Sequence, residues 1–391
     1  MTGGPLDGIR VVEFGNLIAG PYAGMLLADL GADVVKVEPP SGDLGRSFGP
    51  YVVGESAFFM AVNRGKRSVC LSPKDPDARR WLGDLVASAD VLLHNLRLGA
   101  MERMGLGEED VRRINPAVIY TVVSAFGADG PYADRAGIDV VFQGESGMMS
   151  ITGEPGSPPA KTATTIGDYV AATNAALAVC AALVERAATG RGRRVDVSLR
   201  DGLMAVQSGW NAVAFATGRQ PAKTGTASPF LAPNQAFETA DGHLTLAIVS
   251  DAHFLVLCRE LGRLDLADRY PTNGARMQGR AELVAELEAV FRSDLTSRWV
   301  ERLGAAGLPV GRVLTLPEVW HDPQVTHNEM VVEYDHPVAG RVRGIGSPLR
   351  LDGAPARASD PPPALGQHTA AVLAELGATD QEIAELIGDP A

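Results

Sequence analysis

Hydrophobic residues in the first 200 positions form short apolar runs that alternate with longer amphipathic stretches. The apolar runs have the length of buried strands and cover residues 9–14, 34–38, 91–95, 118–126 and 195–199. Helical periodicity lies between them, at residues 21–30, 77–88 and about 168–189. Apolar strands separated by helices indicate a mostly parallel sheet covered on both faces. We therefore predict a doubly wound α/β domain in the N-terminal half.

The pattern changes after residue 204. A stretch that contains Pro and Gly, Thr224–Phe237, precedes a short apolar strand at 243–249, and a helical pattern rich in Leu, Glu and Arg follows at 280–293. Residues 205–328 are therefore predicted to form a smaller α+β domain with its linkers. Beyond Gly340, a strand-like turn at 341–346 leads through a Pro-rich segment to a final amphipathic helix at about 369–386.

Composition and charge narrow the range of ligands. The chain has 391 residues, of which 46% are hydrophobic and 21% charged, as in ordinary folded globular proteins. Its formal net charge is −12, and the acidic residues are spread along the whole chain. This argues against a non-specific nucleic-acid or membrane binder. Any anionic ligand must be held by a local basic site.

Cysteine and histidine spacing predicts neither a disulfide framework nor a metal site. Cys70, Cys180 and Cys258 lie far apart and form no CxxC pair, and the seven histidines include no H-x-x-x-H pair. The N-terminus shows no signal-peptide pattern, and the longest apolar run, Ala175–Val184, is shorter than the roughly 20 residues of a membrane span. A cytoplasmic location is therefore expected.

Three nucleotide or nucleophile motifs are absent. Glu38 ends the second predicted strand, where an acid can hold ribose hydroxyls, but the loop before it, GNLIAGPYAG, lacks the G-x-G-x-x-G spacing. There is no Walker loop for phosphoryl transfer and no G-x-S-x-G nucleophile elbow. Carboxylates therefore remain as the candidate chemical groups.

Asp168 is the first of these carboxylates. It follows a Gly- and Pro-rich loop and is predicted at the N-cap of the long helix that ends before Gly190. As an N-cap alone it would contribute about 1 kcal/mol to stability. The same position also suits a nucleophile or base, because the helix dipole and free N–H groups are expected to lower the pKa of a carboxylate there.

Several ordered blocks together resemble a known enzyme family, and they run from AGPYAGMLLADLGADVVKVEPPSGD near the N-terminus through NRGKRSVCLSPK, NLRLGAMERMGLG, SAFGADGPYADRAGID, IGDYVAA and ERAATGRGRRVDVSLRDG to LGQHTAAVLAELG. They are similar to the signature blocks of the family III (CaiB/BaiF) CoA-transferases, which include formyl-CoA transferase and carnitine CoA-transferase. The resemblance covers essentially the whole chain.

The resemblance implies that Asp168 is a covalent nucleophile. It would move CoA from an acyl-CoA thioester to a free carboxylic acid through mixed-anhydride and aspartyl-CoA thioester intermediates, with a Gly-rich neighbourhood supplying N–H donors to the oxyanions. No tightly bound cofactor is implied. The matching CoA-binding positions are Ile18, Ala19, Leu71, Lys74, Asn95, Leu96, Arg97 and Arg103, with Lys66 and Arg67 as weaker candidates.

Two departures from the family pattern bear on the reaction. Related α-methylacyl-CoA racemases carry a histidine thirty positions before the aspartate, whereas this chain has Ile138, which cannot move a proton. The Gly-rich loop of formyl-CoA transferase is replaced by Thr224–Phe237, which argues against oxalate and formate as substrates. Asp139 and Glu145 receive no role. An acyl-CoA racemase or epimerase and a non-catalytic acyl-CoA-binding protein remain as alternatives.

The resemblance also implies an interlocked homodimer. In such a dimer each chain forms a Rossmann-like large domain, with a parallel sheet built from both termini, here residues 1–204 and 329–391, and the small domain at 205–328 lies between these two parts.

Overall fold

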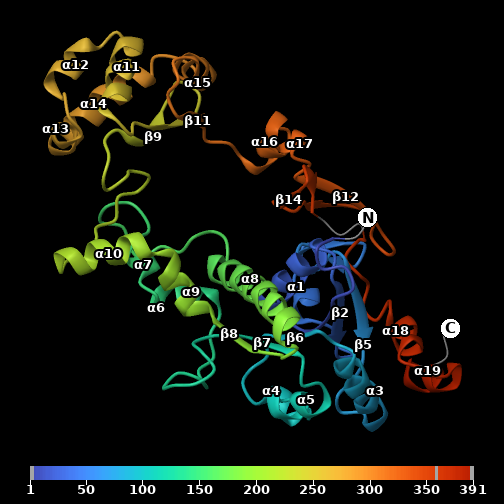
Figure 1. Ribbon diagram of the computed structural model, residues 1–391. Coiled ribbons are helices and arrows are strands. Elements are labelled where there is room, and N and C mark those ends of the chain that lie inside the picture. Colours follow the sequence, from blue (N-terminus) through green and yellow to red (C-terminus); the bar gives the residue numbers. More distant parts are fainter. Residues whose placement is uncertain (1–3, 357–359, 388–391) are drawn as a thin grey trace. The chain divides into compact units, whose positions relative to one another are not determined.

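The computed structural model describes residues 4–356 and 360–387. It divides into two compact units (Figure 1): a large unit of residues 1–148, 162–216 and 323–391, and a small unit of residues 149–161 and 217–322. The short segment 149–161 joins the small unit because Lys223 donates hydrogen bonds to the carbonyls of Ser157 and Pro158, 3.0 and 2.6 Å away. The small unit therefore begins later than residue 205 and includes an earlier segment.

Six parallel strands form the central sheet of the large unit, in the order β5-β2-β1-β6-β7-β8. Their bounds are β1 Arg10–Phe14, β2 Asp33–Glu38, β5 Lys66–Cys70, β6 Val91–His94, β7 Ile119–Ser124 and β8 Arg194–Ser198. Counted along the chain, this order is 3-2-1-4-5-6, the order of a Rossmann fold, so the strand order reverses between β1 and β6. The predicted doubly wound parallel sheet is confirmed.

Strand β5 was not predicted from the pattern. It begins with Lys66 and Arg67, so its sequence lacks the apolar run of its neighbours, yet the Lys66 side chain is fully buried beside β2. The buried Glu13 carboxylate, 2.7 Å from Lys66 Nζ, is its ionic partner. An ion pair therefore replaces the apolar contact that usually identifies a buried strand.

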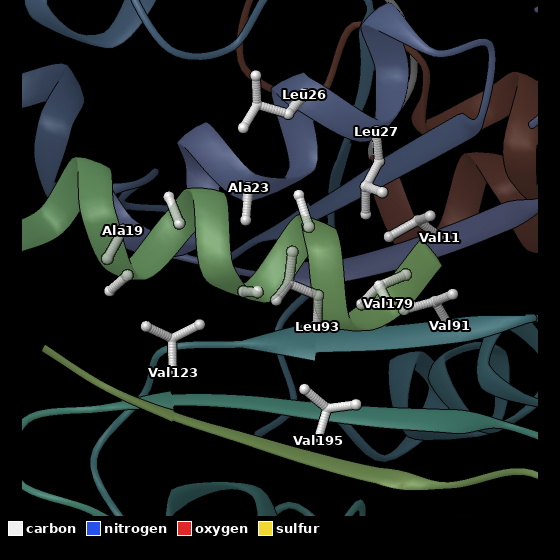
Figure 2. Close-up of a cluster of buried hydrophobic side chains, with 14 of the residues drawn as sticks. Val11, Ala19, Ala23, Leu26, Leu27, Val91, Leu93, Val123, Val179 and Val195 are labelled. Atoms are coloured by element: carbon white, nitrogen blue, oxygen red, sulfur yellow. The ribbon is translucent and has the colours of Figure 1, made fainter. Parts of the chain in front are cut away.

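Alternate strand residues point to opposite faces of the sheet, and each face has its own hydrophobic core. Helices α1 (Ala19–Asp29) and α8 (Ile166–Thr189) cover one face, and Figure 2 shows Ala23 and Leu27 of α1 and Val179 of α8 directed toward the strand residues Val11 and Leu93. Helices α3 (Pro76–Ala87), α5 (Glu108–Ile114), α18 (Thr369–Glu375) and α19 (Asp380–Ile387) contribute to the other core.

Helix α8 is the one helix in the described part of the chain that is long and apolar enough to cross a membrane. Its Ala171, Ala175 and Val179 are buried in the core with α1 and the sheet, so it occupies the position of a core helix of the large unit. It ends, as expected, before Gly190, whose φ of 69° is the left-handed conformation of a helix C-cap.

The C-terminal segment adds helices to the large unit, and all six strands of the central sheet lie before residue 199. The expectation of a sheet built from both termini is therefore wrong for this sheet. Glu375 of α18 pairs with Arg10 of β1 and Arg67 of β5 at 2.9 and 2.6 Å. The single helix predicted at about 369–386 is two, α18 and α19, because the chain adopts a positive φ of 93° at Gly377 between them.

The remaining short elements of the large unit connect and extend this framework. They are η1 Leu44–Ser47, β3 Tyr51–Val52, β4 Glu55–Ser56, α2 Ala57–Met60, α4 Ala100–Arg103, α6 Asp139–Glu145, α9 Leu199–Val206, α10 Ser208–Thr217, α17 Pro323–His327, β12 Val331–His336, β13 Gly340–Ile345, β14 Arg350–Leu351 and β15 Ala354–Pro355; α7, Met148–Ile151, lies where the two units join along the chain.

The small unit has the α+β composition expected of the second domain. Its antiparallel sheet has the order β11-β10-β9. Its elements are β9 Asn234–Glu238, β10 His243–Ala247, α11 Asp251–Leu261, α12 Leu264–Arg269, α13 Asn273–Gln278, α14 Arg280–Phe291, α15 Thr296–Ala305, β11 Val310–Arg312 and α16 Leu316–Trp320. Their core includes Phe237, Leu257, Phe291 and Trp299.

Candidate active site

The site is built at the carboxyl edge of the sheet, where β1 and β6 end and the strand order reverses. Ligands of open α/β sheets bind in the crevice at such a point. Asn95, directly after β6, accepts a hydrogen bond from the Asn16 N–H at 2.8 Å and donates to the Asn16 carbonyl at 2.9 Å. A Cβ on Gly20 would come within 2.9 Å of Asn95 Oδ1, so this close contact requires glycine. Asn95 therefore joins the loop after β1 to the loop after β6.

The loop after β1 is held in an unusual conformation. Leu17 has a φ of 63°, which is uncommon for a leucine, and its N–H donates to Asp43 Oδ1 at 2.9 Å. Ile18 is the N-cap of α1 and Ala19 is its first residue, and both are buried. These two predicted CoA-binding positions thus lie at the start of α1, at the point where the strand order reverses.

Buried charged side chains hold the loop after β1 in place. Lys36 Nζ lies 2.9 Å from both Glu13 Oε1 and Asp43 Oδ2 and donates to the Gly15 carbonyl at 2.7 Å. Lys66 contacts the other oxygen of Glu13 and donates to the Pro21 carbonyl at 2.6 Å. We call Glu13, Lys36, Asp43 and Lys66 the buried charge network. Its contacts to Gly15, Leu17 and Pro21 make it a support of the loop.

Three residues considered at the sequence level therefore have structural roles. Lys66 is enclosed in the buried charge network, and Arg67 is paired with Asp33 and Glu375. The ammonium group of Lys66 and the guanidinium group of Arg67 thus already form ion pairs with carboxylates of the fold. We therefore no longer consider these two residues as CoA ligands. Glu38 is buried and accepts from Arg46 at 2.7 and 2.8 Å, so its carboxylate is equally engaged and is not positioned as a ribose ligand.

The predicted cations Lys74, Arg97 and Arg103 are exposed. They follow β5 and β6, and their side chains form no ion pair or hydrogen bond with another side chain in residues 4–356 and 360–387. Leu71 is buried, and Leu96 packs against the same core from the loop after β6. Within the described residues, the chain after β5 and β6 thus presents three cations without side-chain partners, and its Leu71 and Leu96 pack in or against the core.

Asp168 lies in the first turn of α8. Thr165 is the N-cap, so Asp168 is the third residue of the helix and the prediction that it caps the helix is wrong. Tyr169 packs edge-on against Tyr22 of α1, with ring centroids 4.8 Å apart. The first turns of α8 and α1 are therefore in contact, which brings Asp168 to the same edge as Ile18 and Ala19.

Asp139 supplies the capping carboxylate of α8 from another helix. As the first residue of α6, it is buried, and its Oδ1 accepts from the Gly167 N–H at 2.7 Å. Gln143, one turn later, donates to Asp139 Oδ2 at 2.5 Å and accepts from the Thr162 N–H at 2.9 Å. The contact between Asp139 and Gly167 was not predicted because the two residues are 28 positions apart in the sequence. The i,i+4 spacing of the polar residues Asp139 and Gln143 was a usable signal for it.

Burial and a neighbouring charge raise the pKa of Asp168 to about 7. Desolvation of the half-buried carboxyl is the main cause, repulsion from Asp139 adds to it, and a hydrogen bond with Thr165 opposes both. The expected lowering by the helix N-terminus is therefore wrong, because the N–H of Gly167 is bonded to Asp139 and the N–H of Asp168 to the Thr165 carbonyl. For the same reason these two N–H groups are not free to bind an oxyanion.

The position of the racemase histidine is held by Ile138. It is the N-cap of α6, next to Asp139, and its side chain is 62% exposed. His94 ends β6 on the opposite face of the sheet, packed against Tyr120, and burial lowers its pKa to about 4. Neither residue provides a base beside Asp168.

The chain is similar to proteins of known activity along nearly its whole length. The family model described as CoA-transferase family III matches residues 6–369. A succinyl-CoA:glutarate CoA-transferase of Mus musculus is 37% identical over 377 residues, which cover 95% of this chain and 86% of that protein. A succinate–glutarate CoA-transferase of Agrobacterium fabrum is 38% identical over 387 residues, which cover 95% and 96% of the two chains.

Solved structures have the same fold. The crystal structure of a CAIB/BAIF family protein from Brucella suis matches with a TM-score of 0.87 and 37% identity, over 96% of this chain and 100% of that one. The fold, the family match and the identity to named CoA-transferases agree, and this chain belongs to CoA-transferase family III.

Proposed function

We propose that this enzyme transfers CoA from an acyl-CoA to a free carboxylic acid through covalent intermediates on Asp168. The observation that supports this most strongly is the position of Asp168: a half-buried carboxyl at the start of α8, the helix packed against α1 where the strand order reverses, with a pKa of about 7. A carboxylate that is poorly solvated and still ionised in part at neutral pH is a better nucleophile than one in water.

The reaction needs neither a redox step nor a proton carrier. The Asp168 carboxylate attacks the thioester carbon and the C–S bond breaks. CoA departs as a thiolate, and a mixed anhydride between Asp168 and the donor acid remains. The thiolate then attacks the aspartyl carbon, which releases the donor acid and forms an aspartyl-CoA thioester. The acceptor carboxylate attacks this thioester to form a second anhydride, and the thiolate finally takes the new acyl group and restores the Asp168 carboxylate.

CoA is proposed to bind across the carboxyl edge of the sheet. Lys74, Arg97 and Arg103 carry the positive charge that an otherwise acidic protein needs to bind the CoA phosphates. Leu71, Leu96 and the backbone at Ile18 and Ala19 are the proposed apolar and main-chain contacts of CoA. Asn95 acts indirectly, because its side chain is engaged with Asn16.

We propose that the acyl donor is the CoA thioester of a dicarboxylic acid and that the acceptor is also a dicarboxylic acid. The two relatives compared above are named for succinate and glutarate, and both are more than a third identical to this chain. We take succinyl-CoA and glutarate as the first pair to assay.

We also propose that the working enzyme is a homodimer, interlocked as the family resemblance implies. Apolar side chains on the outer side of the large unit support it: Leu177 and Val184 of α8 are 68% and 74% exposed. Phe215 of α10 is 85% exposed. A second copy of the chain that covers these helices would bury them. Sedimentation at a mass near twice 41.0 kDa is the expected result, and a monomer at assay concentrations would contradict it.

A transfer assay tests the proposed reaction. Purified enzyme with succinyl-CoA and glutarate should form glutaryl-CoA and succinate in equal amounts, and Asp168→Ala should lose at least about a thousandfold of this rate. Asp380→Ala, which removes an exposed aspartate from the first turn of α19, is the matched control and should retain activity. Near-normal transfer by Asp168→Ala would reject the mechanism.

The same preparation separates the alternatives. A racemase would exchange the α-hydrogen of a branched acyl-CoA for deuterium in heavy water without an acceptor acid. A binding protein would bind CoA without turnover of any acid in a panel. Ile138 beside Asp139 favours transfer over the first of these.

A further inference from the structure

Two arginines lie over the same aromatic surface at the carboxyl ends of β7 and β8. Arg135, in the loop after β7, has its guanidinium carbon 4.7 Å from the ring centroid of Phe126 and 4.5 Å from that of Tyr132. Arg200, the second residue of α9, lies 5.4 and 5.6 Å from the same two centroids. Stacking on aromatic rings holds a guanidinium in place while leaving its edge N–H groups available.

The two guanidinium groups differ in their partners. Arg135 donates to both oxygens of Glu145, at 3.2 and 2.6 Å. Arg200 has a side chain only 26% exposed, yet within residues 4–356 and 360–387 its guanidinium donates no hydrogen bond. The carboxylate of Asp201 lies 3.6 Å from its Nε, beyond hydrogen-bond distance. Since a largely covered guanidinium normally has an acceptor, Arg200 is ready to bind an anion.

This aromatic surface is built on elements that pack around the first turn of α8, where Asp168 lies. Phe126 and its neighbour Phe142 belong to the same core as α8, and their ring centroids are 5.2 Å apart. Phe142 is on α6, three residues after the Asp139 that caps α8, so about 5 Å of helix separates these two positions. Helix α9 packs on the first turns of α8, where Leu203 would lie 3.2 Å from a Cβ on Gly167. The helix that carries Arg200 thus packs against the first turn of the helix that carries Asp168.

We propose that Arg200 binds the distal carboxylate of a dicarboxylic acid while the other carboxylate reacts at Asp168. This inference rests on the proposed function and assigns its specificity to one residue. A carboxylate meets the planar fork of arginine through two parallel N–H···O bonds, which a monocarboxylic acid of equal length cannot make at its methyl end. Arg135, already neutralised by Glu145, supports the same surface without offering free donors.

The test compares glutarate with pentanoate as acceptors, with succinyl-CoA as donor in both assays. For a double-displacement reaction the acceptor's kcat/KM reports only the step that involves the acceptor, so effects on the donor cancel. The ratio of kcat/KM for glutarate to that for pentanoate should fall about tenfold to a hundredfold in Arg200→Gln. Arg200→Lys keeps the positive charge and loses the planar fork of N–H donors. Its ratio should lie between those of wild type and Arg200→Gln. Arg193→Gln, an exposed arginine paired with Glu185, is the charge-matched control and should leave the ratio unchanged.

A CoA phosphate is the other source of an anion for Arg200, and calorimetry separates it. The Kd of CoA should be the same in wild type and Arg200→Gln. A tenfold weaker CoA affinity with an unchanged acid ratio would overturn the proposal and assign Arg200 to a phosphate. The proposal would also be overturned if Arg200→Gln lowered kcat/KM equally for glutarate and for pentanoate. A wild-type enzyme with a higher kcat/KM for pentanoate than for glutarate would overturn it as well.

Failure of the proposed function would be visible separately. If the wild-type enzyme transferred CoA to no acid, glutarate would be titrated directly into wild type and Arg200→Gln in the presence of CoA. Binding that depends on Arg200 would support the subsite without transfer, and absence of glutarate binding would reject it.

Discussion

At the scale of single residues, Asp168 is defined by what its surroundings do to its charge. The start of a helix usually favours a carboxylate, but here the N–H groups of Gly167 and Asp168 already have acceptors. Burial and Asp139 then dominate and raise the pKa of Asp168 to about 7. The residue is therefore poised to change its ionisation near neutral pH, which makes its chemistry sensitive to a single neighbouring charge.

Removal of the Asp139 charge should move the pH dependence of the reaction. Because the proposed mechanism requires Asp168 to attack as a carboxylate, kcat/KM for the acyl-CoA should rise with pH through the pKa of Asp168 in the free enzyme. Asp139→Asn keeps an oxygen for the Gly167 N–H and removes the like charge, so the rise should occur at lower pH. Glu145→Gln, on the same helix and paired with Arg135, is the control. An unshifted profile in Asp139→Asn would contradict the account.

The raised pKa also has a consequence for stability. An acid whose pKa is higher in the folded than in the unfolded state stabilises the fold most at low pH, and this contribution is lost as pH rises toward the folded pKa. Between about pH 4 and 7 wild type should therefore lose stability relative to Asp168→Asn, which does not titrate. The difference in melting temperature, variant minus wild type, should increase from pH 4 to pH 8. A constant difference would show that the pKa of Asp168 is ordinary.

At the scale of elements, the loop after β1 depends on charges buried beneath it. Glu13 is the shared partner of Lys36 and Lys66, and Lys36 in turn holds Gly15 and Asp43. Burial alone would raise the pKa of Glu13, but the two lysines outweigh it and the pKa is lowered. Strands β1, β2 and β5 are thus joined by ionic contacts at these positions, whereas valine side chains make the contacts at other buried positions of the sheet.

Loss of the central carboxylate should be costly. Glu13→Ala leaves two buried ammonium groups with fewer partners, and breaking a buried ion pair by removing one member costs about 3–5 kcal/mol. Denaturant unfolding of the variant and of Glu109→Ala, an exposed control expected to lie within about 0.5 kcal/mol of wild type, measures the difference. A cost for Glu13→Ala as small as that of Glu109→Ala would mean that the network does not stabilise the sheet.

The limits of sequence analysis follow the same contacts. Apolar runs such as those containing Val11 and Val91 predicted five of the six strands, because apolar burial is periodic and local. Strand β5 was missed because Lys66 is buried through a partner far away in sequence. Asp168 was found as a candidate from its place at the start of the long helix, and the family resemblance then implied its covalent role, but its pKa was predicted in the wrong direction. That value depends on Asp139 and on burial, which no local pattern contains.

At the scale of the whole molecule, an acidic enzyme must bind a polyanion. The net charge of −12 repels CoA at long range, so at the proposed CoA site the three exposed cations Lys74, Arg97 and Arg103 would carry a large share of the electrostatic attraction. Their ion pairs with phosphate would form in water and would be screened by salt. CoA affinity should therefore decrease as ionic strength rises.

Neutralising the three cations tests this arrangement. The triple variant Lys74→Gln, Arg97→Gln, Arg103→Gln should raise the Kd of CoA at least about tenfold at low salt and flatten its salt dependence. The control replaces three arginines of the small unit, Arg292, Arg298 and Arg302, with Gln and has the same net charge. Equal loss of affinity in both triple variants would show that overall charge, and not the carboxyl edge, determines CoA binding.

Covalent capture of CoA on Asp168 is the decisive test of the proposed nucleophile. The enzyme would be incubated with succinyl-CoA without acceptor, quenched in acid, digested and analysed by mass spectrometry. We expect a peptide that contains Asp168 and carries CoA in thioester linkage. This adduct should be sensitive to hydroxylamine, absent from Asp168→Asn and discharged by glutarate. An enzyme that transfers CoA between acids with no adduct, or with the adduct on another residue, would contradict it.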